Sequence, residues 1–443
     1  MDIIRKIFEP TIEVKNLEIL NKASDKSRSD DIGERKIGST SPYLIIRDMQ
    51  FFDDSVISFE LSTEKFLPRV IATISDVNSR LNTDALPLDD ILSVYIKSDN
   101  KDFKGIRQDY RIINFHKRGN DYVVEAILEV KGLWVDRIKG FEGTSFEFLK
   151  VIAKELKLGF SSNLEATNDK MYHICPNINY HDFINNELMN VCYLDNKSFF
   201  ICYIDQFYYL NVVEVNRLVK RDWDISESSS VYIGEEHSID KTREVGNQYI
   251  SNHPRMGGKP AFLIEYDINN RAGRSGIKNG YKTNLIYYDK NNEKYDEFFI
   301  ETITTDGITD NDIVIKGEID ENHLENTRDI SLGSYFQDNV HKNYYVAKVM
   351  NNYNSEELAK VNLPIEIAGI DFGLYNYQSI PLEIMVKDQS YVDLDQRNEE
   401  EGLNKALSGM YIITGLKYLY DKDDRRFFQK MVLKRREYKK INR

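Results

Sequence analysis

Gly143-Thr144-Ser145-Phe146-Glu147-Phe148-Leu149 is the stretch at which the hydrophobic pattern of this chain changes from alternation to helical spacing. The Thr144 hydroxyl can accept a hydrogen bond from a free N–H at the start of a helix, and the Glu147 carboxylate can reach back to another, which is a capping box. Apolar residues then continue at helical spacing as far as Leu156, and Gly159 suits the residue that follows a helix. The sequence therefore predicts a helix over about 145–157.

The residues that follow alternate between strand and helix patterns. A strand is predicted at 171–175, ended by Pro176. A second helix is predicted at 180–191, because Phe183, Ile184, Leu188 and Val191 form one apolar stripe. A hairpin is predicted from 199–204 and 207–215, with its turn near Asp205-Gln206. Residues 140–215 are thus expected to form a compact α+β module.

The residues before this module indicate β structure. Val70, Ala72 and Ile74 share one face at a period of two, as in a strand. Gly119-Asn120 lies between two alternating runs, which is a hairpin signal. Short strands at near-regular spacing favour a small barrel or sandwich, and they are predicted at 43–49, 56–61, 69–74, 91–96, 106–116 and 122–130.

The residues after the module are polar as far as about 345, and the last hundred return to a β pattern. Strands are predicted at 261–266, 283–288, 298–304 and 312–315, and then at 363–370, 380–386, 410–420 and 427–435. No repeat of 20 to 50 residues is visible, which argues against solenoids and propellers. The β-rich segments at both ends nevertheless suggest a weak twofold organisation.

The 443 residues and 51.8 kDa of the chain predict two to four domains. With 41% hydrophobic and 30% charged residues, the chain is globular. Its net charge of −13 disfavours a diffuse nucleic-acid binder. The last 27 residues, from Lys417, carry +7, and the rest carries −20. This basic end is interpreted either as a solvated edge strand or as a contact with an acidic partner.

The cysteine content and the amino-terminal sequence indicate the cellular compartment in which the protein folds. Three cysteines, Cys175, Cys192 and Cys202, make no disulfide framework, which indicates a reducing environment. The opening MDIIRKIFEP has no apolar core of a secretory signal. The longest apolar run, 199–204, is far shorter than the ~20 residues that span a bilayer. A soluble protein that folds in a cytoplasm, without membrane insertion, is expected.

Two short motifs partly match sequences that bind phosphate or magnesium in nucleotide-binding proteins. Gly258-Lys259 is followed by Pro260 and has His253 where a phosphate loop needs glycine, so it does not fit such a loop. Asp371-Phe372-Gly373 spells the magnesium-binding triplet of kinases, but no His-Arg-Asp loop and no glycine-rich loop precede it. A strand followed by a turn is the preferred interpretation.

Two clusters were tested as metal sites. The spacing of His173, Cys175, His181, Cys192 and Cys202 does not fit zinc, so buried structural cysteines are expected. Asp306, Asp310 and Asp312 form an acidic, turn-prone segment without the spacing of an EF-hand, and a solvated loop is preferred to a calcium site. We predict no catalytic, cofactor-binding or metal-binding residues and no cofactor, and an enzyme is not indicated.

Several segments, read in chain order, resemble the central hub protein of the baseplate in contractile-tailed bacteriophages. The resemblance is carried by the order of the segments rather than by one motif, and it covers about 40–215 and 360–437. The segments are Ile57-Ser58-Phe59-Glu60-Leu61, Phe66-Leu67-Pro68-Arg69, Leu86-Pro87-Leu88, 143–149, Leu158-Gly159-Phe160-Ser161-Ser162-Asn163, Asn168-Asp169-Lys170-Met171, Cys175-Pro176-Asn177, Asp182-Phe183-Ile184, 198–211, 408–418 and 428–433.

This resemblance implies a homotrimer in which each subunit carries two β-barrel tube domains related by pseudo-twofold similarity, so that three chains make a pseudo-sixfold ring. The implied fold is mainly β with α+β insertions and two peripheral domains. The implied boundaries are 1–135 for the first barrel, 136–215 for an inserted α+β domain, 216–245 with 346–443 for the second barrel, and 246–345 for a variable peripheral domain.

The implied partners are further copies of the chain, a central spike, a tail tube or tube-initiator ring, and baseplate wedge proteins. Genomic DNA would pass through the ring without specific binding, and an acidic chain suits such a channel because like charges repel. The implied location is the virion tail baseplate, after assembly in the host cytoplasm. Since the sequence ends at Arg443 without a β-helix, the spike is expected to be a separate protein.

Three alternatives stay open. The same architecture occurs in the first part of type VI secretion spike proteins, so a spike base of such a machine is one alternative. A tail-associated cell-wall hydrolase would need two carboxylates about 5 to 10 Å apart in a cleft. A carbohydrate-binding β protein is suggested only by the 28 tyrosines.

Overall fold

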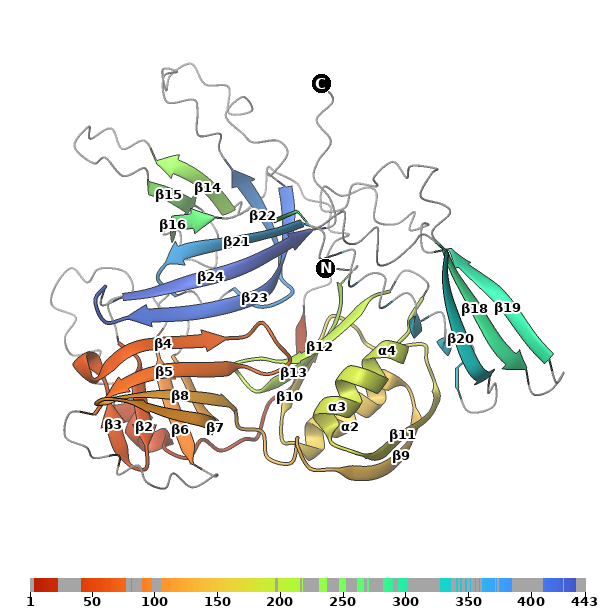
Figure 1. Ribbon diagram of the computed structural model, residues 1–443, viewed down its shortest axis with the longest axis horizontal. Helices are drawn as coiled ribbons and strands as arrows, with labels where there is room; N and C mark the ends of the chain where they lie inside the picture. Colours follow the sequence, from red (N-terminus) through yellow and green to blue (C-terminus); the bar gives the residue numbers. More distant parts are fainter. Residues whose placement is uncertain are drawn as a thin grey trace, which may run out of the picture.

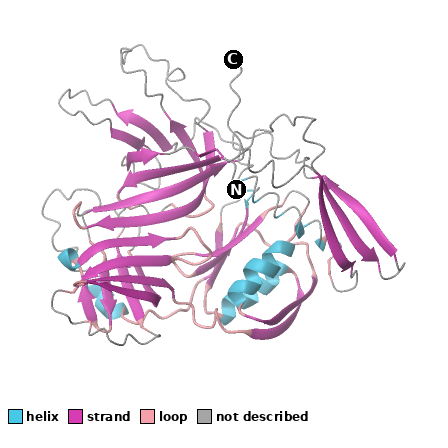
Figure 2. Ribbon diagram, in the orientation of Figure 1, coloured by secondary structure: helices cyan, strands magenta, loops and turns pink. Residues whose placement is uncertain are grey.

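The structure is a computed structural model of the 443-residue chain. It describes residues 4–22, 41–76, 81, 90–97, 105–195, 198–215 and 217, and between 231 and 435 it describes the strands and short stretches between them. The fold is mainly β with few helices, as the sequence predicts, and Figure 2 shows the helices gathered mostly in one region. No helix in the described part is long and apolar enough to cross a membrane.

Seven strands from the first third of the chain form one antiparallel arrangement, in the order β3-β2-β6-β7-β8-β5-β4 (Figure 1). Val70, Ala72 and Ile74 are fully buried, which confirms the predicted alternation. Gly119, in the β7–β8 turn, has φ +66°, a conformation that glycine adopts without strain. The strands are β2 (Tyr43–Ile46), β3 (Met49–Phe51), β4 (Val56–Ser62), β5 (Arg69–Ser75), β6 (Ile91–Ile96), β7 (Ile106–Arg118) and β8 (Asp121–Leu128).

Seven strands from the second half of the chain form another arrangement. Their pairings run β14-β15-β16-β21-β24-β23-β22 and return to β14, so they close a circuit. Only the β14–β22 pairing in this circuit is parallel. The strands are β14 (Val231–Glu236), β15 (Asn247–Ser251), β16 (Ala261–Tyr266), β21 (Val361–Ala368), β22 (Ser379–Ile384), β23 (Gly409–Asp421) and β24 (Arg426–Arg435), and the two-residue β17 (Asn269–Asn270) continues β16 along β21.

The two arrangements share one strand order. When β2, β3, β4, β5, β6, β7 and β8 are matched in sequence to β14, β15, β16, β21, β22, β23 and β24, neighbours in the first arrangement are also neighbours in the second. They differ at two pairings among the described strands: β2 is antiparallel to β6 whereas β14 is parallel to β22, and β15 pairs with β16 whereas β3 does not pair with β4. The chain thus contains the same seven-strand order twice.

The match extends to the irregularities of the ladders. The β4–β5 ladder shifts register between Val56 and Ser58, and the β16–β21 ladder shifts between Leu263 and Glu265. The β7–β8 ladder shifts between Ile112 and Asn114, and the β23–β24 ladder shifts between Ile413 and Gly415. Because a bulge fixes the register on both of its sides, these shared bulges align the two arrangements residue by residue.

One antiparallel ladder joins the two arrangements into a single sheet. β23 pairs with β4, so that Lys417 faces Ser62 and Asp421 faces Ser58. β23 therefore contacts β24 along one side and, along the other, first β22 and then β4. Tyr418 is fully buried at this joint.

The middle of the chain forms an α+β module beside the first arrangement (Figure 1). Its four-stranded sheet has the order β1-β10-β13-β12, and β9 pairs with β11 separately. The fully buried Leu149 and Ile152 of helix α2 belong to the main hydrophobic core. The elements are β1 (Arg5–Phe8), β9 (Arg137–Gly143), α2 (Ser145–Glu155), β10 (Gly159–Ser162), β11 (Met171–Ile178), α3 (Tyr180–Asp182), a π-helical turn (Phe183–Leu188), α4 (Met189–Val191), β12 (Phe200–Ile204) and β13 (Tyr209–Glu214).

Two local predictions in this module were wrong. The left-handed residue after α2 is Lys157, at φ 59°, whereas Gly159 is already the first residue of β10. Gly159 is needed there for space, since a Cβ atom would lie 2.5 Å from the Tyr209 ring of the neighbouring strand. Pro176 does not end its strand, because β11 continues to Ile178. β11 pairs only with β9 in the described part, and an edge strand tolerates the missing N–H of proline.

The remaining strands form a separate three-stranded sheet, β19-β18-β20. Its strands are β18 (Lys282–Asp289), β19 (Lys294–Glu301) and β20 (Thr327–Tyr335). The strand predicted at 298–304 corresponds to β19, which begins earlier than expected, and the strand predicted at 312–315 lies outside the described residues.

Candidate functional site

A buried carboxylate closes the start of helix α2. Asp169, which is fully buried, accepts hydrogen bonds from the Ser145 backbone N–H at 3.1 Å and from the Tyr193 backbone N–H at 3.0 Å. The Thr144 hydroxyl and the Glu147 carboxylate make the predicted capping box. Because these groups use the free N–H groups of the first turn, the helix start is occupied by the chain's own side chains.

The predicted cluster of histidines and cysteines is divided by the structure. Cys175, Cys192 and Cys202 are all buried and reduced, as expected. Burial raises the pKa of each of these thiols, which disfavours the reactive thiolate. Within the described residues, no group of three or more His, Cys, Asp or Glu side chains is arranged to hold a metal ion.

The histidines of this region have different surroundings. His173 is buried near Asp169, and burial lowers its pKa. His181 instead stacks on Trp134, with ring centroids 4.5 Å apart, and its Nδ1 lies 2.9 Å from Asp182 Oδ1. The sequence pattern did not single out His341, whose Nε2 lies 3.0 Å from the Val191 carbonyl oxygen and whose pKa is lowered by burial.

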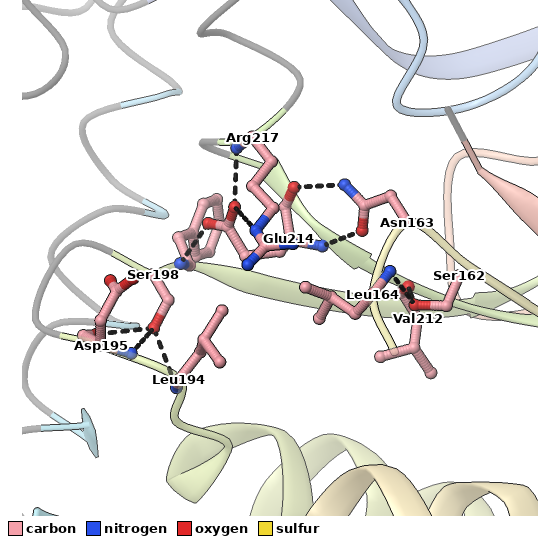
Figure 3. A network of polar contacts seen from close by, with 10 residues as sticks. Ser162, Asn163, Leu164, Leu194, Asp195, Ser198, Val212, Glu214 and Arg217 are labelled. Atoms are coloured by element: carbon pink, nitrogen blue, oxygen red, sulfur yellow. Dashed lines mark hydrogen bonds and ion pairs between the residues drawn. The ribbon is translucent and has the colours of Figure 1, made fainter. Parts of the chain in front are cut away.

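A second buried network fastens the end of β13, where the chain leaves the module (Figure 3). Asn163 donates to the Glu214 carbonyl at 2.8 Å and accepts from the Glu214 N–H at 2.9 Å. The buried Glu214 carboxylate accepts from the Phe199 N–H at 3.0 Å and the Arg217 N–H at 2.6 Å. This network holds the polypeptide in place rather than presenting reactive groups to solvent.

A third polar cluster lies where the module meets both seven-strand arrangements. The Asn376 side-chain amide donates to the Thr63 carbonyl at 2.6 Å, and the Thr63 N–H donates to the Leu416 carbonyl at 2.8 Å. The Tyr203 hydroxyl of β12 donates to the Asn376 carbonyl at 2.8 Å. Asn376 therefore links three parts of the molecule and holds the joint between them.

The basic carboxyl-terminal strands are paired within the chain. Lys417 lies 3.2 Å from Glu60, and Lys430 lies 2.6 Å from Glu366. β24 pairs with both β21 and β23, so the interpretation as a solvated edge strand is wrong for the described residues. Arg435 is fully buried and stacks over the Tyr411 ring at 4.8 Å.

One surface of the module is apolar and exposed. Ile138 of β9 is 81% exposed, and Ile174 of β11 is 66% exposed. They project from the same side of the two-stranded β9–β11 sheet as Tyr172, because Ile138 faces Pro176 and residues two apart share a face. Such a face on the β9–β11 sheet is a candidate contact for another protein.

The other short motifs considered in the sequence are either buried in the core or outside the described residues. Phe372 is buried in the core, with its ring 5.4 Å from that of Tyr418, and the flanking Asp371 and Gly373 lie outside the described residues. The Gly258-Lys259 segment and the Asp306–Asp312 acidic segment also lie outside them.

Sequence reasoning missed the three side chains that organise these networks. Asp169, Asn163 and Asn376 stand in polar stretches without a recognisable spacing, and their partners lie 24, 51 and 313 residues away. The one local signal was the capping box, which indicated that the start of α2 needs polar partners.

The fold is similar to that of a solved tail protein. The tail protein from Neisseria meningitidis MC58 matches with a TM-score of 0.50 and 9% identity, over 89% of this chain and 96% of that chain. The 43 kDa tail protein of prophage MuSo2 from Shewanella oneidensis matches with a TM-score of 0.49 and 7% identity, over 90% of this chain and 98% of that chain.

A type VI secretion component also matches. It is an E. coli protein described as structurally similar to bacteriophage T4 tail proteins, with a TM-score of 0.40 and 10% identity, over 90% of this chain and 79% of that chain. No family model and no curated protein matches the sequence. The similarity to the tail protein from Neisseria meningitidis MC58 confirms the resemblance to tail proteins at the level of the fold.

Proposed function

We propose that this chain is the structural hub of a phage tail baseplate, a homotrimeric ring that joins the sixfold tail tube to the threefold central spike. The observation that carries this proposal is the seven-strand order that occurs twice in one chain. Three copies supply six equivalent units, so a threefold ring of this chain matches a sixfold partner on one side and a threefold partner on the other. The fold shared with a tail protein supports the same role.

The two seven-strand arrangements are our candidates for the two barrel-like tube domains. We keep the first at 1–135 and the inserted module at 136–215, except that β1, which pairs with β10, is assigned to the module. For the second, pairing of β15 and β16 with β14 and β21 favours adding 247–270 to 216–245 and 346–443. The peripheral domain then begins after β17 and includes the sheet β19-β18-β20.

The proposed ring encloses a channel for genomic DNA. The net charge of −13 favours a wall that repels the phosphate backbone, so that DNA passes without binding. The proposed partners are further copies, the spike, the tube or tube-initiator ring and the wedge proteins, in the virion baseplate after assembly in the host cytoplasm. The role is structural rather than catalytic.

Native mass in solution tests this proposal. Light scattering on the purified chain, alone and after co-expression with the spike protein of its tail, is expected to show three copies of the 51.8 kDa chain per particle in at least one of the two samples, after the mass of any bound spike is subtracted. A monomer in both samples, or a stable dimer or tetramer, would contradict the proposal. Clearing of purified peptidoglycan by the same protein would favour a hydrolase.

A further inference from the structure

The second half of β7 has an open edge. Ile112 makes the last bond towards β6, donating its N–H to the Asp90 carbonyl at 3.0 Å. From there to Arg118, β7 pairs with β8 on one side, and on the other side no strand among the described residues pairs with it. The side chains here are mostly exposed, including Ile113 at 51%. An exposed strand edge of this kind is a template for another strand.

The equivalent edge in the second arrangement is occupied. Ile413 makes the corresponding last bond towards β22, donating its N–H to the Gln378 carbonyl at 3.0 Å. Beyond it, β23 pairs with β4 of the first arrangement. The ion pair between Lys417 and Glu60, at 3.2 Å, crosses this joint. One of two equivalent edges is therefore paired within the chain, while the other has no partner strand in the described part of the structure.

The strand of the second arrangement that corresponds to β4 also has an edge that could pair with another strand. By the shared bulges, β4 corresponds to β16 continued by β17. β15 pairs with β16 only over Ala261–Leu263, on the side away from β21. In the described residues, no strand pairs with that side at Glu265, Tyr266 or β17. These positions correspond to the part of β4 that pairs with β23.

We propose that the open edge of β7 takes the β16–β17 edge of a second copy of this chain, in the antiparallel register that β23 and β4 already use. Counting from the bulges, His116 corresponds to Lys417 and Asn269 to Ser62, and Lys417 faces Ser62 within the chain. His116 therefore faces Asn269 of the second copy. The contact is head-to-tail, since it joins two different edges, and repetition of it closes a ring.

Charge supports this pairing. The edge of β7 ends in exposed Lys117 and Arg118, whereas the opposing edge carries Glu265. In the proposed register Arg118 and Glu265 are diagonal neighbours on one face of the sheet, the relation that Lys417 and Glu60 have in the joint within the chain. Opposite charges at such positions stabilise the pairing, and like charges oppose it.

Disulfide trapping between copies tests the register. Facing Cα atoms of antiparallel strands lie about 4.5–5.5 Å apart, which a disulfide spans. A mixture of the His116→Cys chain and the Asn269→Cys chain is expected to give a disulfide-linked dimer under mild oxidation, and neither chain alone should. The native cysteines are all buried, which keeps them from competing. The matched control is Asn114→Cys mixed with Asn269→Cys, two positions out of register, which should give little product.

Three results would overturn the inference: no product from the first mixture, equal product from the control mixture, or equal product from His116→Cys alone, which would indicate a symmetric contact. The inference rests on the proposed trimer, so native mass is measured on the same samples. Trimers without the cross-link would overturn the register and leave the hub proposal standing. Monomers both alone and after co-expression with the spike protein would overturn both.

A charge exchange gives a second readout. Arg118→Glu and Glu265→Arg should each weaken self-association by roughly fivefold, and the double variant should restore it. A double variant that associates more weakly than either single variant would contradict the pairing. Lys6→Glu, an exposed change on β1, serves as the control and should leave association unchanged.

Discussion

Asp169 and Thr144 share the task of closing the first turn of α2, and this explains why a short helix can stand in a mainly β molecule. Two different side chains accept N–H groups of the first turn, which have no partner within the helix. The Thr144 contribution was predictable, because its partner lies three residues away. The Asp169 contribution was not, because it depends on a loop that returns 24 residues later.

Removal of the Asp169 carboxylate tests this account. Asp169→Ala is expected to lower the free energy of unfolding by about 2–3 kcal/mol, since charge-assisted bonds to buried N–H groups are lost. Urea unfolding followed by fluorescence measures the change. The control is Glu165→Ala, four residues earlier and exposed, which should change stability by less than about 0.5 kcal/mol. Equal effects of the two variants would contradict the assignment.

Lowering the pH should decrease the stability of the folded protein, through the buried side chains of His173 and His341. Burial lowers the pKa of both in the folded state, so below about pH 6.5 the unfolded chain binds protons that the folded chain does not. Stability contributed by these neutral imidazoles is therefore present above pH 6.5 and is lost as the pH falls. The urea midpoint should decrease between pH 7.5 and 5.5, and His173→Gln should reduce that decrease. An unchanged pH dependence in the variant would argue against His173 as a source.

At the scale of elements, strands such as β5 and β8 were predictable because one face of each is buried and the alternation is visible in sequence. The single strand predicted at 43–49 was wrong, because left-handed Arg47 and Asp48 form a turn that divides it into β2 and β3. The helix over 145–155 was predictable from its capping box. Whether a strand lies at the edge or in the interior of its sheet was not predictable, because this depends on strands that are distant in the sequence. β24 is internal only because β21, about 65 residues earlier in the chain, pairs with it. Pro176 was expected to end its strand for the same reason: the sequence does not show that β11 lies at the edge of its sheet, where a proline can be accommodated.

Two glycines provide a matched test of how β10 packs on β13. Gly159→Ala places a Cβ 2.5 Å from the Tyr209 ring and should lower the free energy of unfolding by about 1–3 kcal/mol. Gly140→Ala in β9 meets no atom within 4 Å and should be nearly neutral. Thermal unfolding of the two variants compares them directly. A Gly159→Ala protein as stable as the wild type would contradict the close approach of the two strands.

At the scale of the whole molecule, the repeated strand order was only weakly predictable. The sequence shows two β-rich ends, but equivalent positions conserve burial rather than residue type. Val124 corresponds to Met431 and Ala126 to Leu433, and all four are buried. The candidate networks at Asn163 and Asn376 were likewise invisible, because folding creates them by joining distant segments. The repeated organisation was instead expected from the resemblance of ordered sequence segments to baseplate hubs, and the fold is similar to that of a tail protein.

The exposed surface of the two-stranded β9–β11 sheet bears on assembly rather than on folding. Because Ile138 and Ile174 are largely exposed, replacing both with Ser should leave the midpoint of thermal unfolding within about 2 °C of the wild type. If this surface meets another tail protein, the same variant should lose co-purification with that protein. A large drop in thermal stability would show that the surface is covered within the chain.

The measurement that tests the central claim most directly is the rotational symmetry of the assembled particle, from averaged electron-microscopy images of the native complex viewed end on. The account predicts a ring of three chains with six similar lobes around a central hole. A particle with two or four chains, or three chains without six lobes, would contradict it.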